Sequence, residues 1–171
     1  MTGLVFVDTS ILLYAVDNRD ALKHRAAREW MDRLWRERSG RTGVQVLSEF
    51  YVRATRILAP GLSREEAREQ VLALSEWGPQ AVDVRALELG HQIQSRHGLS
   101  WWDSLIVAAA RLQGCALLLT EDLQHAAVYA GVTALDPFRA GVQESQGIYA
   151  ARIVAEPRRG RGRPRKDRVP A

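Results

Sequence analysis

Cysteine is nearly absent from the sequence, and so is any long apolar segment. Cys115 is the only cysteine among 171 residues, so no disulfide can form within the chain. Because the apolar residues 116–119 follow it, we expect a buried thiol. The longest apolar stretch, residues 105–120, is interrupted by Arg111 and Gln113, so no membrane-spanning helix is expected.

The beginning of the chain also lacks the features of a secretion signal. No basic residue precedes the apolar segment Leu4 to Val7, and Asp8 interrupts that segment early. We therefore expect a cytoplasmic protein that does not associate with membranes.

The body of the chain has no excess of positive charge, although the whole carries a formal charge of +4. Residues 157–171 hold seven Arg or Lys against Asp167, a net of +6, which leaves 17 basic and 19 acidic residues, a net of −2, in the other 156. This basic segment has almost no apolar content, so we expect disorder without a partner. The sequence predicts one domain over residues 1–138 and an extension over 139–171.

Apolar segments alternate with amphipathic segments along the first 138 residues. The expected strands are residues 4–7, 44–47, 81–84, 116–119 and 132–135. The last of these is expected at an edge of the sheet. The expected helices cover about residues 20–38, 46–57, 63–77, 84–97 and 103–113. This alternation predicts an α/β fold, a three-layer α/β/α sandwich with a central parallel sheet.

Four acidic residues occupy related places in this pattern. Asp8 and Asp122 follow predicted strands, while Glu49 and Asp103 lie near the starts of predicted helices. In open parallel sheets, sites form outside the carboxyl ends of the strands, so the four side chains are expected to converge there.

Each acid also has an ordinary structural interpretation. Asp8 and Asp103 are of the type that caps helix N-termini, and Ser100 with Asp103 matches a capping box. Glu49 is less easily explained, because it borders the apolar stripe of its helix, where an unpaired carboxylate is costly. Four converging carboxylates would repel one another, and a divalent Mg²⁺ or Mn²⁺ ion would relieve that repulsion.

Five segments of the sequence, taken in order, resemble a known family. They are residues 6–14 (FVDTSILLY), 46–51 (VLSEFY), 99–110 (LSWWDSLIVAAA), 118–124 (LLTEDLQ) and 132–138 (VTALDPF). The first four resemble the motifs of the PIN domain, especially those of VapC-type toxins, and the fifth resembles the closing strand. The resemblance implies endoribonuclease activity that depends on Mg²⁺ or Mn²⁺, usually in the toxin component of a type II toxin–antitoxin system.

The resemblance also implies roles for individual residues. The catalytic residues would be Asp8, Glu49, Asp103 and Asp122. Three of these, Asp8, Asp103 and Asp122, would hold the metal. Thr9 or Ser10 matches a small hydroxyl position that orients the substrate, and Glu121 is the alternative to its neighbour Asp122.

The basic extension contains a second resemblance. Arg161-Gly162-Arg163-Pro164 resembles an AT-hook, whose arginines enter the narrow minor groove of A·T-rich DNA. The nucleic-acid-binding residues would then be Arg161, Arg163, Arg165 and Lys166. A solubilising tail or a general RNA-binding arm are the alternative interpretations.

Other functions remain open from the sequence alone. A non-catalytic DNA-binding regulator would use the tail, and a nuclease of this kind could also act on DNA. A haloacid-dehalogenase phosphatase needs a second Asp where Ser10 stands. The expected partners are RNA, an antitoxin, A/T-rich DNA and a second copy of the chain. By resemblance, Trp30, Trp35 and Tyr51 are candidates for an antitoxin groove, although the first two also suit core packing.

Overall fold

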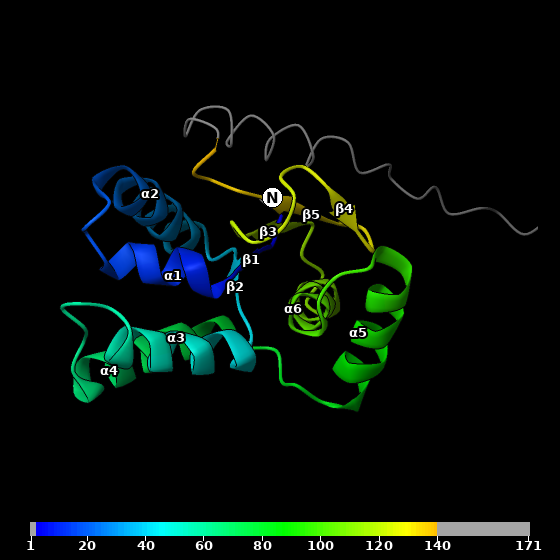
Figure 1. Ribbon diagram of the computed structural model, residues 1–171, viewed down its shortest axis with the longest axis horizontal. Helices are drawn as coiled ribbons and strands as arrows, with labels where there is room; N and C mark the ends of the chain where they lie inside the picture. Colours follow the sequence, from blue (N-terminus) through cyan, green and yellow to red (C-terminus); the bar gives the residue numbers. More distant parts are fainter. Residues whose placement is uncertain (1–2, 140–171) are drawn as a thin grey trace, which may run out of the picture.

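The computed structural model describes residues 3–139 (Figure 1). This part contains the strands β1 (Val5–Val7), β2 (Gly40–Arg41), β3 (Leu117–Leu119), β4 (Val128–Tyr129) and β5 (Val132–Leu135). Its helices are α1 (Thr9–Val16), α2 (Ala21–Glu37), α3 (Val44–Arg56), α4 (Arg64–Leu74), η1 (Ser75–Trp77, a 3-10 helix), α5 (Val84–His97) and α6 (Trp101–Leu112). The predicted hook residues, Arg161, Arg163, Arg165 and Lys166, lie outside the described residues.

The strands form one sheet in the order β2-β1-β3-β5-β4. β1 pairs in parallel with β2 and β3, and β3 pairs in parallel with β5. Every residue of β1 and β3 is buried, which is why both strands are continuous apolar segments in the sequence. In Figure 1, α1 and α2 lie to the left of the strands, α3 and α4 at the lower left, α6 below β5 and β4, and α5 at the lower right. The predicted three-layer sandwich with a mostly parallel central sheet is confirmed.

The prediction that residues 132–135 form an edge strand is wrong. The two-residue strand β4 pairs with β5 in antiparallel orientation and occupies the edge instead. Ala130 and Gly131 form the turn between them, both with positive φ, 51° and 85°. This is the backbone conformation that tight two-residue hairpins require, and Gly131 adopts it without steric cost.

Two further predicted strands are also wrong. Residues 44–47 belong to α3, and the strand β2 lies just before them, at Gly40–Arg41. Residues 81–84 form no strand, because Asp83 caps α5 by accepting a hydrogen bond from the Ala86 N–H at 2.9 Å. Val84 is 69% exposed, so the alternation of this segment does not reflect burial in a sheet. One parallel bridge, between Gly43 and Gln80, is the only pairing near it in the described part of the chain.

The short strand β2 is a place of close packing between distant parts of the chain. A Cβ atom at residue 40 would lie 2.5 Å from the Trp77 ring, so only glycine fits beneath that side chain. The Trp77 ring also contacts Trp35, with 4.9 Å between ring centroids. A glycine that looks like a chain break in the sequence is therefore a contact point between β2 and η1.

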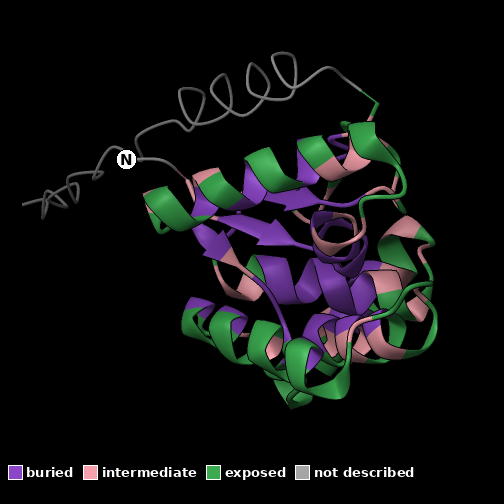
Figure 2. Ribbon diagram, turned by 90° about the vertical axis from the view of Figure 1, so that its left-hand side faces the viewer, coloured by how far each residue is buried: buried purple, intermediate pink, exposed green. Residues whose placement is uncertain are grey.

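The helices turn apolar faces toward the sheet and polar faces outward (Figure 2). On α2 the buried residues recur at helical spacing, and Asp20 caps the helix through the N–H groups of Leu22 and Lys23. Trp30 is buried in the core as predicted, whereas Trp35 is 36% exposed. Ser63 and Glu66 form a capping box at the start of α4.

Two further expectations from the sequence concern the Cys115 thiol and membrane-spanning helices. Cys115 is buried as predicted, and burial raises the pKa of its thiol to about 12. Within the same residues, no helix has the length and apolar content needed to cross a membrane.

Candidate active site

Asp8 lies where the carboxyl end of β1 meets α1. Its N–H donates to the Leu119 carbonyl at 3.0 Å, which ties it to the end of β3. Oδ1 accepts from the Thr9 N–H at 2.7 Å, as in a helix cap, and Oδ2 accepts from the Thr120 hydroxyl at 2.8 Å. Asp8 therefore caps α1, and its carboxylate is also held from the end of β3 by Thr120.

The surroundings of Asp8 disfavour its charge. Burial raises the pKa of its carboxyl to about 6, and the negative charges of Asp122 and Glu49 add to that rise. The hydrogen bonds from Thr120 and Thr9 act in the opposite direction. A side chain that only capped a helix would not need such a position, because the same hydrogen bond can form at the surface.

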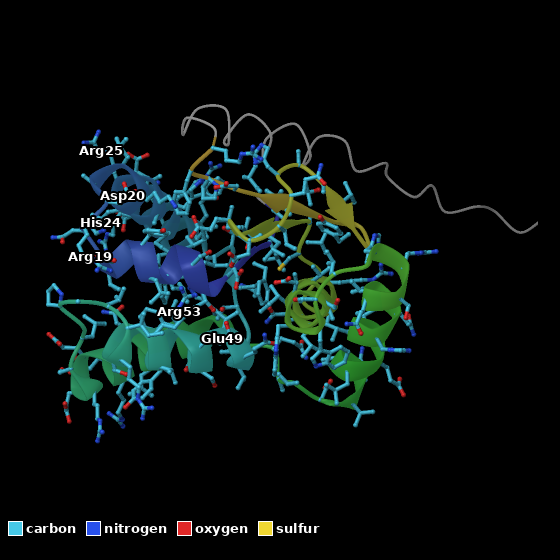
Figure 3. The ribbon with its side chains drawn as sticks, in the orientation of Figure 1. Arg19, Asp20, His24, Arg25, Glu49 and Arg53 are labelled. Atoms are coloured by element: carbon cyan, nitrogen blue, oxygen red, sulfur yellow. The ribbon has the colours of Figure 1, made fainter. Side chains whose placement is uncertain are left out.

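Glu49 faces the start of α1 from the sixth residue of α3. One carboxylate oxygen, Oε2, accepts from the Thr9 hydroxyl at 3.2 Å, and Oε1 accepts from the Gln45 amide at 3.1 Å. Figure 3 shows Glu49 and Arg53 on the same side of α3. The partly buried carboxylate is thus oriented by neutral donors, which hold it without neutralising its charge.

Asp103 lies in the first turn of α6, which begins two residues earlier than predicted. Ser100 is the N-cap: its Oγ accepts from the Asp103 N–H at 3.1 Å and donates to the Asp103 carboxylate Oδ2 at 2.6 Å. Ser100 is thus the N-cap, but the expected capping box is incomplete, because the Asp103 carboxylate accepts from the Ser100 hydroxyl and not from the Ser100 N–H.

The neighbours Glu121 and Asp122 have different surroundings. Glu121 accepts a 2.6 Å hydrogen bond from Lys23, whose Nζ also donates to the Tyr14 hydroxyl at 3.0 Å. Asp122 is exposed and its N–H donates to the Thr120 hydroxyl at 3.1 Å. Of the two neighbours, Glu121 is therefore held by the α1–α2 pair, whereas Asp122 is left to face the other acids.

The pKa of Asp122 reports which groups surround it. Partial desolvation raises it, followed by the charges of Glu121 and Asp103, and the charge of Glu49 has the same direction. Arg53, one helical turn after Glu49, lowers it. Together with the environment of Asp8, this places the four predicted acids in one electrostatic neighbourhood at the carboxyl edge of the sheet.

The four acids suit a hard divalent cation by chemistry and by charge. Carboxylate oxygens are the ligands that Mg²⁺ and Mn²⁺ prefer. The pKa values of Asp8 and Asp122 are raised mainly by burial, and neighbouring carboxylates add to that rise. As the side chains of residues 3–139 stand, no three acidic, His or Cys groups are arranged to hold one ion.

The hydroxyl groups next to Asp8 separate into two kinds. Thr9 contacts Glu49, whereas the Ser10 hydroxyl is buried and has no hydrogen-bond partner in the described part of the chain. Sequence reasoning missed Thr120, which bridges Asp8 and the Asp122 N–H, and it missed Gln45. Thr120 lies two residues before Asp122, a spacing typical of a threonine that binds a nearby backbone N–H.

Comparisons with known proteins concern the family and the fold of the chain. The family model of the PIN domain matches residues 5–131. A search of curated proteins found no match. Among solved structures, a toxin–antitoxin complex from Klebsiella pneumoniae has a TM-score of 0.58 and 19% identity, covering 78% of this chain and 97% of that chain.

Two other solved structures are similar in fold. FitAB bound to an IR36 DNA fragment has a TM-score of 0.60 and 17% identity, covering 79% of this chain and 96% of that chain. The Mycobacterium tuberculosis toxin VapC20, which cleaves the sarcin–ricin loop, has a TM-score of 0.54 and 24% identity, covering 75% and 98%. Because the family model spans most of the sequence, the chain belongs to the PIN-domain family.

Proposed function

We propose that this protein is a metal-dependent endoribonuclease that hydrolyses RNA phosphodiester bonds, as the toxin component of a toxin–antitoxin pair. The observation that carries the proposal is the buried carboxylate of Asp8, whose pKa is raised by burial and by the charges of Asp122 and Glu49. In a chain of the PIN-domain family, such clustering of like charge supports a site for a cation and a phosphate.

In this proposal, Asp8, Asp103 and Asp122 would hold Mg²⁺ or Mn²⁺. Glu49 would accept a proton from the attacking water molecule. When bound, the ion supplies positive charge that polarises the phosphate and offsets charge on the leaving oxygen. Glu49, oriented by Thr9 and Gln45, accepts a proton from the water that attacks phosphorus in line. The bond from phosphorus to the leaving oxygen then breaks, and the Thr9 hydroxyl keeps the Glu49 carboxylate in place.

Arg53 gives the site a cation of its own. Its charge acts on Asp122, and it lies on the same side of α3 as Glu49 (Figure 3). A guanidinium in this place would contact a phosphate oxygen of the RNA as the strand enters. The body of the chain is slightly acidic in total, so local cations of this kind matter for an anionic substrate.

The proposal is tested by an RNA-cleavage assay on the purified full chain. Cleavage is expected in Mn²⁺ or Mg²⁺ and not in EDTA, and the Asp103→Asn protein is expected to be folded and inactive. Equal cleavage in EDTA, or full activity in folded Asp103→Asn protein, would contradict the assignment. An assay on single-stranded DNA with the same ions separates an RNA-directed from a DNA-directed enzyme.

An antitoxin partner is part of the proposal. Support comes from the similar fold of a solved toxin–antitoxin complex and from accessible aromatic side chains on the helices. Tyr51 lines an apolar pocket of about 560 Å³ between α3 and α4, and Trp35 lines another beside α2, whereas Trp30 is buried. A small DNA-binding reading frame immediately upstream, whose product copurifies with this chain, is the expected observation.

The hook-like tail stays a prediction, and so does homodimerisation. If the tail binds nucleic acid without taking part in catalysis, a chain ending near Ala155 should still cleave RNA and should lose salt-sensitive binding to A/T-rich DNA or to RNA. Unchanged binding after truncation would refute this role and the alternative of a tail-dependent DNA-binding regulator together.

A further inference from the structure

A second pocket lies at the opposite end of α6 from Asp103. It has a volume of about 330 Å³ and is lined mainly by polar side chains: Gln92, Arg96 and His97 of α5 and Arg111 of α6, with Ala130 of the β4–β5 turn. Figure 1 shows the upper end of α5 beside β4. We name these residues the basic pocket.

The basic pocket concentrates positive charge without acidic partners in its lining. Two guanidinium groups line it, and its remaining lining residues are polar, aromatic or apolar, with no carboxylate among them. Arg111 donates through Nη1 to the Ala130 carbonyl, which anchors the side chain against the β4–β5 turn. Its other N–H groups, and those of the exposed Arg96, remain directed to solvent or to a ligand.

His97 adds an unsatisfied group to the same pocket. Its ring packs edge-on against Tyr129, with 5.5 Å between ring centroids, which fixes its orientation. The Nε2 atom is buried and has no hydrogen-bond partner among residues 3–139. Buried polar atoms normally have a partner, and this nitrogen would gain one from a ligand only if the ring turned toward the pocket.

The chemistry of these groups selects a phosphate. Guanidinium groups match phosphate oxygens with paired N–H donors, and the Gln92 amide adds another neutral donor. A pocket of this volume lies at the lower end of the range for small-molecule sites, so it suits a phosphate with part of its nucleoside and not a large ligand.

The place of the basic pocket relates it to the acid cluster. Arg111 follows Asp103 by eight residues on α6, about 12 Å along the helix axis at about 1.5 Å per residue. Neighbouring phosphates of one strand in a stacked helix are about 3.4 Å apart along the axis, so a few nucleotides span this length. Residues 104–110 of α6, between these two places, are buried, so a strand held at both places would pass over the surface beside α6 and not along the helix itself.

We propose that the basic pocket binds a backbone phosphate of the RNA, a few nucleotides from the bond that is cleaved. The identity of the ligand as RNA rests on the proposed function, whereas the affinity for phosphate rests on Arg96, Arg111 and His97. The pocket would contribute to RNA binding, not to bond breaking.

The test compares two double variants of the full chain with the same loss of charge. Arg96→Gln/Arg111→Gln removes the guanidinium groups of the basic pocket. Arg64→Gln/Arg85→Gln removes two exposed arginines outside it and is the matched control. Binding of a short labelled single-stranded RNA is measured by fluorescence anisotropy in EDTA, so that cleavage does not interfere, at several salt concentrations.

The pocket variant is expected to bind RNA about 10-fold more weakly, and the control by less than about 2-fold. The slope of log affinity against log salt should fall in magnitude by about 0.7 for one lost phosphate contact on a single strand. Arg96→Gln alone, at an exposed position, should weaken binding about 3-fold if the double variant does not fold. Equal weakening by the pocket and control variants would overturn the proposal.

A local readout distinguishes the sources of phosphate. The imidazole NMR signals of His97, assigned with a His97→Gln variant, are followed as RNA, a mononucleotide or inorganic phosphate is added. Shifts with RNA that vanish in the Arg96→Gln/Arg111→Gln protein support the proposal. Shifts with free phosphate or mononucleotide alone would reject RNA as the source, and no shift with any of them would reject the site.

The two proposals fail in different ways. RNA that binds through the basic pocket but is not cut in Mn²⁺ contradicts the proposed function and leaves the pocket standing. RNA that is cut in Mn²⁺ while both double variants bind it equally contradicts the pocket alone.

Discussion

Two helices of this protein begin with the same local arrangement of a serine and an acid three residues later. At the start of α4, Ser63 and Glu66 exchange hydrogen bonds, with the Glu66 carboxylate accepting from the Ser63 N–H at 2.7 Å. At the start of α6, Ser100 and Asp103 contact each other through the serine hydroxyl, at 2.6 and 3.1 Å. Judged by the nearest residues alone, each acid is a partner of the serine that caps its helix.

The two arrangements differ in what lies beyond the helix. The hydrogen bonds from Ser63 lower the pKa of Glu66, so its charge is stabilised where it stands, at the surface. Asp103 instead raises the pKa of Asp122, a residue from the end of another strand. A local motif therefore does not determine the role of an acidic residue. That role depends on the other charged groups that the fold places near it.

The largest expected difference is in RNA cleavage, between a variant that removes the acidic charge at the start of α6 and one that removes it at the start of α4. Asp103→Asn should lower metal-dependent RNA cleavage by on the order of 100-fold or more, because removal even of groups that only support metal ligands costs about 10- to 100-fold. Glu66→Gln should leave cleavage unchanged. Rates at saturating Mn²⁺ are the measurement, and circular dichroism checks that both proteins are folded.

The next effect is on the free energy of unfolding, which the buried charge of Asp8 should lower. Because its pKa is raised from 3.8 to about 6 in the folded protein, the folded state binds the proton more tightly than the unfolded state. Without metal, the free energy of unfolding should therefore fall as pH rises from about 4 to 6 and level off above that range.

Asp8→Asn should remove this cost, but its single oxygen can accept from only one of the two donors, the Thr120 hydroxyl and the Thr9 N–H, which offsets part of the gain. At about 1.4 kcal/mol per pKa unit the cost is at most about 3 kcal/mol, and we expect the variant to be more stable by on the order of 2 kcal/mol at pH 7.5 in EDTA. Denaturant unfolding at pH 7.5 and at pH 4 measures it. A variant that is less stable than the parent at pH 7.5 would show that Asp8 is a cap only.

A smaller effect, on Mn²⁺ affinity, is expected from substitutions of Thr120, where serine serves as the control for valine. Thr120→Val removes the hydroxyl that holds the Asp8 carboxylate and the Asp122 N–H but keeps the shape, so Mn²⁺ affinity should fall about 10-fold. Thr120→Ser keeps the hydroxyl and should restore most of that affinity. Calorimetric titration with Mn²⁺ gives the value without relying on cleavage, and equal affinity in the Val and Ser variants would rule out the bridging role.

The smallest effects come from the serines of the two helix starts. Ser63→Ala and Ser100→Ala should each lower the free energy of unfolding by about 1 kcal/mol, because each loses an N-cap. In addition, Ser100→Ala should reduce cleavage a few-fold, since Asp103 loses a donor. If Ser63→Ala lowered cleavage by the same factor in folded protein, the distinction between the two helix starts would fail.

Much of the fold was predictable, because its signals are local. The buried strands β1 and β3 are continuous apolar runs, and the ends of α2 and α5 follow from Asp20 and from Gly98, whose φ is 66°. The short strands β2 and β4 were not predictable, because each depends on a partner elsewhere in the chain. Ala81–Val84 has strand-like residues, but Asp83 caps a helix there.

The candidate site likewise combines residues that the sequence indicates with residues whose roles depend on distant parts of the chain. The positions of Asp8 and Asp122 at strand ends and of Asp103 at a helix start are visible in the sequence. The choice between Glu121 and Asp122 is not, because it depends on Lys23, which lies 98 residues from Glu121. The bridging role of Thr120 toward Asp8 spans 112 residues and was equally hidden.

The two strands at the margins of the sheet, β2 and β4, are each only two residues long. A sheet grows into filaments, or captures an extended peptide, through free N–H and C=O groups along its outermost strands, and margins this short provide few of them. Joining a neighbouring molecule strand to strand would thus gain little. Association of this domain, with a copy of itself or with another protein, should instead use helix surfaces, and a partner that contributes a helix is the kind this architecture accepts.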